Sequence, residues 1–433
     1  MRRASIPRTL PAVPEPVPPQ RPPLPMLYAL GAYAQAVLTL PSLAAPFVAK
    51  EFDLADGELA LLTGTMSLSA FGALALSRLA DRRGRRSALR LSFAGIGPAL
   101  LATAVAPGAA LYAAAQIVAG ALHGALRSVS VVAITEVSAE DARARGQSWY
   151  GLIAALGSGV PLGFAALFGD RPGGWRLSFL ALGACVLALP WVWRHAPETE
   201  RFESARARGR VQRARMRDLL APRYRRRAVG LAFVGLLRGA GLGALGFYVF
   251  HHGVRNLGLE PWAVALVFVG GGTLGNFGNP AGAIASERWG RRPAQVVFVL
   301  LTVLGGIAYY LVPAGLGLAT PVLLSLAFFV FVFSVQAFGV ADRLMDTELF
   351  PTALRSSYAG LRLIVEAGAA ALGNFSLAAF IAHFDQLGLA MAVLVPALVA
   401  PGLAIFWWAT TETRGLSLDQ AALEHELDTT APL

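Results

Sequence analysis

Long apolar blocks without charged residues are the feature that most restricts the fold of this chain. Residues 27–49, 88–106 and 294–312 form three such blocks, and the only charge inside them is Arg90, near the start of the second. A helix rises about 1.5 Å per residue, so about twenty residues cover the hydrocarbon core of a bilayer. These blocks therefore predict membrane-spanning helices.

The same pattern along the whole chain predicts an all-α membrane protein with twelve transmembrane helices. Hydrophobic residues make up 55% of the chain and charged residues only 15%, which argues against an ordinary soluble domain. The expected spans are 26–49, 59–78, 88–106, 109–134, 147–168, 177–194, 228–251, 261–285, 294–313, 319–347, 356–382 and 388–410.

The placement of basic residues predicts the orientation. Of the 37 lysines and arginines, 29 fall on the side of the N-terminus in the twelve-span scheme and four on the other side. This positive-inside pattern predicts that both termini are cytoplasmic, in a multi-pass protein of the plasma (bacterial inner) membrane. It also accounts for the net charge of +11 without a nucleic-acid partner.

Several function classes are disfavoured by residues that the chain lacks. The single cysteine, Cys185, lies inside a predicted span, so neither a disulfide framework nor a thiolate metal cluster is expected. The single lysine, Lys50, lies near the outer surface, so there is no phosphate-binding loop of an ATP-driven pump. We therefore expect a protein without cofactor or metal, and not an enzyme.

Three features recur at a nearly constant distance and predict a duplicated chain. Glu287 follows Asp81 by 206 residues in two similar Arg-rich loops, Glu348 follows Glu136 by 212, and Glu412 follows Glu198 by 214. We expect two pseudo-symmetric six-helix bundles. The predicted divisions are a disordered Pro-rich cytoplasmic tail (1–25), the first bundle (26–194), an Arg-rich cytoplasmic linker (195–227), the second bundle (228–411) and a cytoplasmic tail (412–433).

The repeated loops resemble the signature of the major facilitator superfamily. The first copy runs from Asp81 to Arg86 and the second from Glu287 to Arg292, and the stretch from Glu348 to Arg355 resembles the sugar-porter and organic-ion branch. The resemblance implies alternating access, with these loops as a latch at the cytoplasmic side; the alternative is that the arginines only set the topology. The latch candidates are Asp81, Arg82, Gly84, Arg85, Arg86, Glu136, Arg143, Glu287, Arg288, Gly290, Arg291, Glu348 and Arg355.

Four arginines inside the predicted spans are the main candidates for a solute site, because a charge at mid-bilayer normally faces a cavity or a partner. Arg127 and Arg238 are expected to hold an anionic group, since guanidinium matches carboxylate or phosphate. The alternative is internal pairing, with Arg343 held by Asp342 or Asp346 and Arg362 held by Glu366. In the resembled fold, spans 1, 4, 7 and 10 line the cavity. The substrate-binding candidates are Gln35, Thr39, Gln116, His123, Arg127, Arg238, Tyr248, Asn276 and Gln336.

Glu366 and His123 are the candidates for proton coupling, because each is a titratable group inside a predicted span. The arginine that relatives carry early in span 4 is Gln116 here, which leaves coupling in doubt. Arg238 stands where sugar porters carry a glutamine, which disfavours a neutral sugar. His251 and His252 are expected on the wet outer surface.

These observations predict a secondary active transporter of a small organic solute. An organic anion is the expected class, and symport with protons is one possible coupling. Efflux of amphipathic drugs by the same fold is the first alternative, and a solute sensor without turnover is the second. The expected partners are a small-molecule solute, the lipid bilayer and, if coupling exists, protons; the protein is expected to function as a monomer.

Overall fold

The computed structural model describes residues 24–137, 143–196, 216–350 and 352–416, all of which are helical or lie in turns and loops between helices. Most of each predicted tail and most of the predicted linker lie outside these ranges. Eleven helices are long and apolar enough to cross a membrane. The eighth expected span corresponds to two shorter helices in series, and the other eleven expected spans correspond to the eleven segments.

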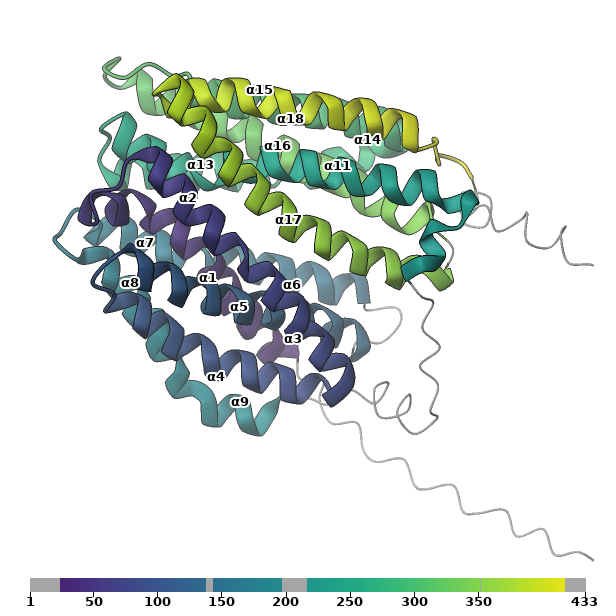
Figure 1. Cartoon of the computed structure of the whole chain (residues 1–433), viewed down its shortest axis with the longest axis horizontal. Coiled ribbons are helices and arrows are strands. Elements are labelled where there is room, and N and C mark those ends of the chain that lie inside the picture. The colour runs from purple at the N-terminus through teal and green to yellow at the C-terminus, as the bar shows by residue number, and fades with distance from the viewer. Residues whose placement is uncertain (1–23, 138–142, 197–215, 351, 417–433) are drawn as a thin grey trace, which may run out of the picture.

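The first bundle contains six of these crossings, and its helices lie together in Figure 1. The second, fifth and sixth are each divided into shorter helices. Its elements are α1 (Leu24–Glu51), α2 (Asp56–Ser67), α3 (Ser69–Arg83), α4 (Arg85–Ala104), α5 (Ala109–Val137), α6 (Arg143–Gly157), α7 (Gly159–Phe168), α8 (Gly174–Ala184), η2 (Cys185–Ala188) and α9 (Leu189–His195).

The second bundle repeats this order with similar interruptions. Its first long helix begins six residues before the expected boundary, at Pro222, because proline is well suited to the first turn of a helix. Its elements are η3 (Met216–Leu220), α11 (Pro222–Phe247), α12 (Val249–His251), η4 (His252–Asn256), α13 (Pro261–Gly275), α14 (Gly278–Arg288), α15 (Arg291–Tyr310), α16 (Ala319–Glu348), α17 (Thr352–Phe384) and α18 (Leu387–Ala409).

The helix interruptions follow from glycine and proline. The break between α6 and α7 falls at Ser158, between two glycines and three residues before Pro161. The break between α13 and α14 falls at Asn276, four residues before Pro280, which has no N–H to bond the Asn276 carbonyl. The Asn279 side chain donates to that carbonyl instead, at 3.3 Å.

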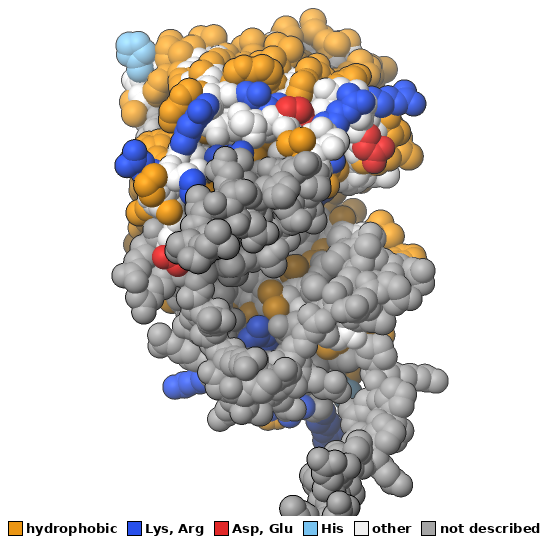
Figure 2. Space-filling model, turned by 90° about the vertical axis from the view of Figure 1, so that its right-hand side faces the viewer, with side chains coloured by type: hydrophobic (Ala, Val, Ile, Leu, Met, Phe, Trp, Pro, Cys, Tyr) orange, Lys and Arg blue, Asp and Glu red, His pale blue; other side chains and the backbone are white. Residues whose placement is uncertain are grey.

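The two bundles lie side by side, and among the described residues their closest packing lies toward one end (Figure 1). We call the end where α1 begins and α18 ends the terminal end, and the other the opposite end. At the opposite end α2 packs along α17 and α7 packs against α13, whereas α6 and α14, the terminal-end continuations, make no comparable contact among the described residues. Viewed from the terminal end, the described surface of the second bundle shows basic side chains among apolar ones (Figure 2).

Candidate functional site

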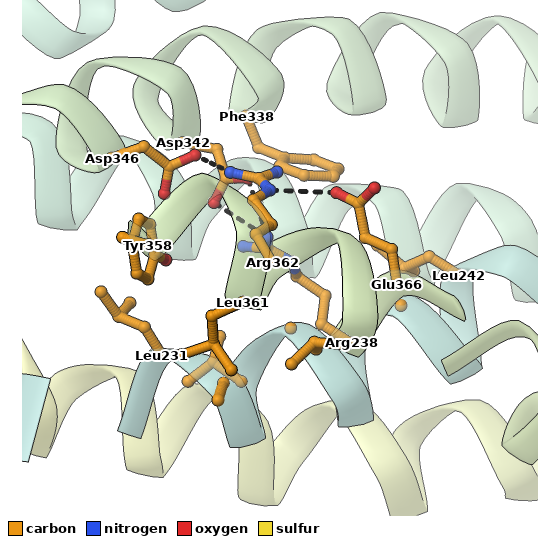
Figure 3. Close-up of a pocket in the computed structure, with 15 residues that line it drawn as sticks. Leu231, Arg238, Leu242, Phe338, Asp342, Asp346, Tyr358, Leu361, Arg362 and Glu366 are labelled. Carbon is orange, nitrogen blue, oxygen red and sulfur yellow. Dashed lines mark hydrogen bonds and ion pairs between the residues drawn. The ribbon is translucent and has the colours of Figure 1, made fainter. Parts of the chain in front are cut away.

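A pocket of about 210 Å³ lies in the second bundle, between α11, α16 and α17 (Figure 3). Part of its lining is apolar and includes Leu231, Leu242 and Leu361. The lining also contains a cluster of five charged residues, which we call the charged cluster: Arg238, Asp342, Asp346, Arg362 and Glu366.

Asp342 is the centre of the charged cluster. One Arg238 nitrogen donates to both of its carboxylate oxygens, at 2.8 and 2.9 Å, and the Arg238 guanidinium lies over the Phe338 ring, 5.1 Å from its centre. The Gln295 amide donates a further bond at 2.7 Å. The Asp342 side chain is only 11% exposed, so these partners replace the water that a buried carboxylate loses. Arg238 is therefore internally paired, and this geometry favours a structural role over solute binding.

Arg362 ties the cluster together along α17. Its guanidinium donates to Asp342 at 2.6 Å and to Glu366, one helical turn away, at 3.0 Å, and it also contacts Asp346. The pairing of Arg362 with Glu366 is the one that the four-residue spacing predicts. Three carboxylates face two guanidiniums, so the fully ionised cluster carries one negative charge in excess. Glu366 is its most accessible member, with 56% of its side chain exposed.

Arg127, on α5 of the first bundle, differs from the arginines of the charged cluster. It is exposed, yet helical geometry places it about half a turn from Leu111, Val118 and Val132, the exposed apolar residues of the same helix. It therefore faces away from the expected lipid side. Arg127 makes no hydrogen bond or ion pair with the residues that the structure describes. It is thus a guanidinium with free donors on the interior face of the first bundle.

Two other first-bundle groups lie near Arg127. His123 lies one turn away on α5, within electrostatic reach of Arg127, and its Nδ1 is 3.2 Å from the Ala119 carbonyl. Tyr150 of α6 is also within electrostatic reach, and its buried hydroxyl has no hydrogen-bond partner in the described part of the chain. The Tyr150 ring packs directly against Gly31 of α1. Arg127, His123 and Tyr150 thus form a polar group drawn from α5 and α6.

The other predicted substrate-binding residues are distributed unevenly. Gln116 is buried and donates to Thr103 at 2.9 Å, which supports a role in packing α5 on α4. Thr39 donates to the Gln35 carbonyl within α1 at 3.1 Å, and both side chains are half-buried. Gln336 of α16 donates to the exposed Asn276 side chain at 2.7 Å, at the break between α13 and α14.

The polar contacts that join the bundles lie at the opposite end, and we call them the opposite-end latch. Asp56 of α2 accepts a bond from Asn256 at 2.9 Å and lies 2.8 Å from His251 Nε2. Deeper along α2, Thr63 contacts both Tyr248 and Asn374. The latch joins the two bundles at the opposite end.

The latch residues His251, His252 and Tyr248 lie in surroundings that differ from those predicted from the sequence. His251 and His252 are 0% and 4% exposed, so the prediction of a wet-surface location was wrong. The sequence placed them beside the membrane surface but did not reveal that α2 and α15 cover them. Tyr248, predicted to bind solute, is fully buried between Thr63 and Asn374, which supports a role in closure. The sequence pointed to Tyr248 only through its helical spacing from Arg238.

The terminal end of the second bundle brings together several predicted latch residues. Arg291 donates to Glu348 at 3.2 Å, and Thr413 donates to the other Glu348 oxygen. Glu412 accepts four backbone N–H bonds, from Arg291, Arg292, Thr413 and Arg414, at 2.9–3.0 Å. Partial burial alone would raise the pKa of Glu412, but these four donors outweigh it and hold the pKa below its ordinary value.

Gly290 makes this arrangement possible. Its φ of +102° is a conformation that side chains disfavour, and a Cβ at this position would lie 2.6 Å from a Glu412 oxygen. Gly84 in the first loop has φ +96° and ψ 159°, against +102° and 162° at Gly290. The two loops therefore share one backbone conformation, which supports the duplication inferred from sequence.

The remaining predicted latch residues are less informative. Arg86 donates to the Ala196 carbonyl at 2.8 Å, and the Arg288 carbonyl accepts from Arg414 at 2.6 Å. Arg85 lies at the start of α4, and Glu287 is exposed near the end of α14. Side chains outside the described part of the structure are those of Asp81, Arg82, Glu136, Arg143 and Arg355.

Comparison with known proteins agrees with the helical duplication. A sequence model of the Major Facilitator Superfamily matches residues 26–374. The chain is 30% identical over 212 residues to a gentisate transporter of Corynebacterium glutamicum, a match that spans 45% of this chain and 46% of that protein, about half of each.

Solved structures show the same fold. The xylose transporter XylE from E. coli, in an inward open conformation, superposes with a TM-score of 0.65 at 18% identity, over 93% of this chain and 98% of that one. The nucleoside transporter NupG superposes with a TM-score of 0.71 at 12% identity, over 88% of this chain and 100% of that one.

Proposed function

The chain belongs to the major facilitator superfamily, and from this premise we propose that it is a secondary active transporter of a small organic anion. An aromatic carboxylate is the first candidate, because the curated relative is a transporter of gentisate. The observation that carries the proposal is Arg127, which lies on the interior face of α5 and has no partner among the described residues.

An unpartnered guanidinium inside a membrane protein favours an anionic ligand. A charge at the bilayer centre costs about 2.5–3.5 kcal/mol on insertion scales, so its retention points to a function. A guanidinium donates two parallel bonds to a carboxylate, and Tyr150 could donate a further bond from its buried hydroxyl. The charged cluster has no free guanidinium, because both of its arginines are held by carboxylates.

We propose that the terminal end is cytoplasmic, on the positive-inside argument, so that the described conformation is inward-open. Opening the other way would require the contacts of Asp56 and Thr63 with the second bundle to break. Alternating access would then exchange the opposite-end latch for contacts between the terminal-end loops. The plasma membrane is the location that this orientation favours.

Glu366 is the proposed proton-binding residue. It is the most accessible carboxylate of a cluster with one negative charge in excess, so it can accept a proton without leaving Arg362 unpaired. His123 is the competing candidate because it lies beside Arg127. Replacing Glu366 by Gln should abolish accumulation driven by a pH gradient while exchange of solute across the membrane continues. The same separation in His123→Gln, with Glu366→Gln unaffected, would assign coupling to His123 instead.

The test of the proposal is uptake by the purified full chain in proteoliposomes, with and without an imposed pH gradient. Radiolabelled gentisate and benzoate should accumulate above protein-free liposomes, whereas xylose should not. Efflux of amphipathic drugs is the second candidate, favoured by the apolar wall and paired arginines of the pocket. Transport of a cationic dye without carboxylate uptake would establish that alternative. Binding of carboxylates without any transport would instead indicate a sensor.

A further inference from the structure

A second pocket, of about 370 Å³, lies at the terminal end of the first bundle. It is formed where the start of α4 lies beside α9, and Arg83 at the end of α3 contributes to it. We call it the α4–α9 pocket. Its principal lining residues are three arginines and two apolar side chains: Arg83, Arg86, Arg90, Leu91 and Trp193.

The charge of the α4–α9 pocket is of one sign. Its lining contains three arginines and, among the described residues, no carboxylate. Arg86 uses its Nε to bond the Ala196 carbonyl at 2.8 Å, and Arg90 bonds the Trp193 carbonyl. Arg83 and Arg86 are exposed. Their guanidinium groups therefore offer N–H donors from which an anion in the pocket could accept hydrogen bonds.

The pocket also borders the expected lipid surface. Leu91 is 48% exposed and Trp193 is 51% exposed, so an apolar edge adjoins the arginines. The Arg90 guanidinium lies over the Trp193 ring, 4.8 Å from its centre. Tryptophan is enriched at the boundary between head groups and hydrocarbon, and arginine at its cytoplasmic side. The pocket thus combines a cationic part at head-group depth with an apolar part along the bilayer.

The second bundle has a similar contact. Arg292, near the start of α15, lies over the Trp407 ring near the end of α18, 4.0 Å from its centre, and bonds the Trp407 carbonyl. The contact comes from a different position of the repeat, because Arg90 follows Gly84 by six residues and Arg292 follows Gly290 by two. An arginine stacked on a tryptophan therefore occurs at the terminal end of both bundles.

We propose that the α4–α9 pocket binds the phosphate of an anionic phospholipid, with an acyl chain lying along Leu91. Basic pockets between transmembrane helices are typical sites for anionic lipid head groups. A zwitterionic lipid would offer the same phosphate but place an ammonium group beside three arginines. The proposal concerns the bilayer as a ligand and is independent of the transported solute.

Binding of defined lipids to the purified full chain tests this proposal. The probes are phosphatidylglycerol, phosphatidylcholine with the same acyl chains, and inorganic phosphate, each titrated and detected by native mass spectrometry. Arg90→Gln removes the stacked guanidinium. Arg83→Gln removes an exposed guanidinium, so this substitution should leave the fold undisturbed. Arg171→Gln is the matched control, because Arg171 lies at the opposite end over the ring of Phe168.

Phosphatidylglycerol should bind more tightly than phosphatidylcholine, and each pocket substitution should weaken its binding about fivefold. The Arg171→Gln control should bind as the wild type does. Equal binding of the two lipids, or unchanged binding in both Arg83→Gln and Arg90→Gln, would overturn the proposal. Displacement of the lipid by millimolar inorganic phosphate would also overturn it, because the pocket would then be a phosphate site and not a lipid site.

Discussion

Replacing Arg127 and Arg238 separately by glutamine should distinguish a solute-binding arginine from a structural one. Arg127 has no partner among the described residues, so Arg127→Gln should change the free energy of unfolding by less than about 0.5 kcal/mol. It should remove charge-assisted hydrogen bonds to the solute worth about 1.5–3 kcal/mol. That loss corresponds to a dissociation constant for gentisate about 10 to 150 times larger.

Arg238→Gln should have the reverse effect. The substitution leaves Asp342, whose side chain is 11% exposed, with Arg362 and Gln295 as its remaining partners. Removing one partner of a buried ion pair costs about 3–5 kcal/mol, and we expect about 3 kcal/mol because the second guanidinium stays in place. The thermal midpoint should therefore fall, while affinity measured well below that midpoint changes little.

The assay for both variants combines gentisate binding by isothermal titration calorimetry with thermal unfolding in the same detergent. Arg171→Gln, at the opposite end, is the control for a general effect of charge. Affinity within twofold of wild type in Arg127→Gln would refute the reasoning about free and paired guanidiniums. So would a large loss of affinity in Arg238→Gln with an unchanged thermal midpoint.

Three further predictions concern the two ends of the molecule. Asp56→Ala removes the acceptor for Asn256 and His251, so the opposite end should open more often. Double electron–electron resonance between spin labels on the α7–α8 turn and the α15–α16 loop should then show longer label-to-label distances. An unchanged distance distribution would contradict a role of Asp56 in closure. Gly290→Ala should lower stability by about 1–3 kcal/mol in thermal unfolding, because φ is +102° and the Glu412 carboxylate occupies the Cβ position. The pKa of Glu412 is lowered in the fold, so the ionised carboxylate stabilises the folded protein above the ordinary glutamate pKa of about 4.3. This stabilisation is lost as the pH falls through the pKa of the folded state. Thermal midpoints measured from pH 6 to pH 3 should therefore fall more steeply in wild type than in Glu412→Gln.

The sequence predicts the helical architecture well because the signals for it are local. Twenty apolar residues must span a bilayer whatever their neighbours, and glycine beside proline interrupts a helix, as at Ser158. The ion pair of Arg362 with Glu366 is likewise local, since four residues make one helical turn. Each of these inferences needs only the geometry of one helix.

The contacts of the candidate site could not be predicted because they join distant segments. Arg238 and Asp342 are 104 residues apart in the chain, and His251 and Asp56 are 195 apart. Many pairings of buried arginines with acids are compatible with the same spans. Only the arrangement of α11, α16 and α17 around the pocket, and of α2 beside His251, selects one of them. The choice between a solute-binding and a structural arginine therefore required the three-dimensional arrangement.

The two bundles share backbone features but differ in their interior charges. Both loops after the second span of each bundle place a glycine with φ near +100° before an arginine-rich helix start, so the repeat is maintained where the backbone is constrained. The interior charges are not repeated: the second bundle buries Arg238 with its own carboxylates, whereas Arg127 in the first bundle has none among the described residues. A solute anion bound by Arg127 would face a cluster that already carries one negative charge in excess. Uptake of a proton by that cluster would remove the repulsion, so the asymmetry of the two bundles gives a physical reason for an anion and a proton to bind together.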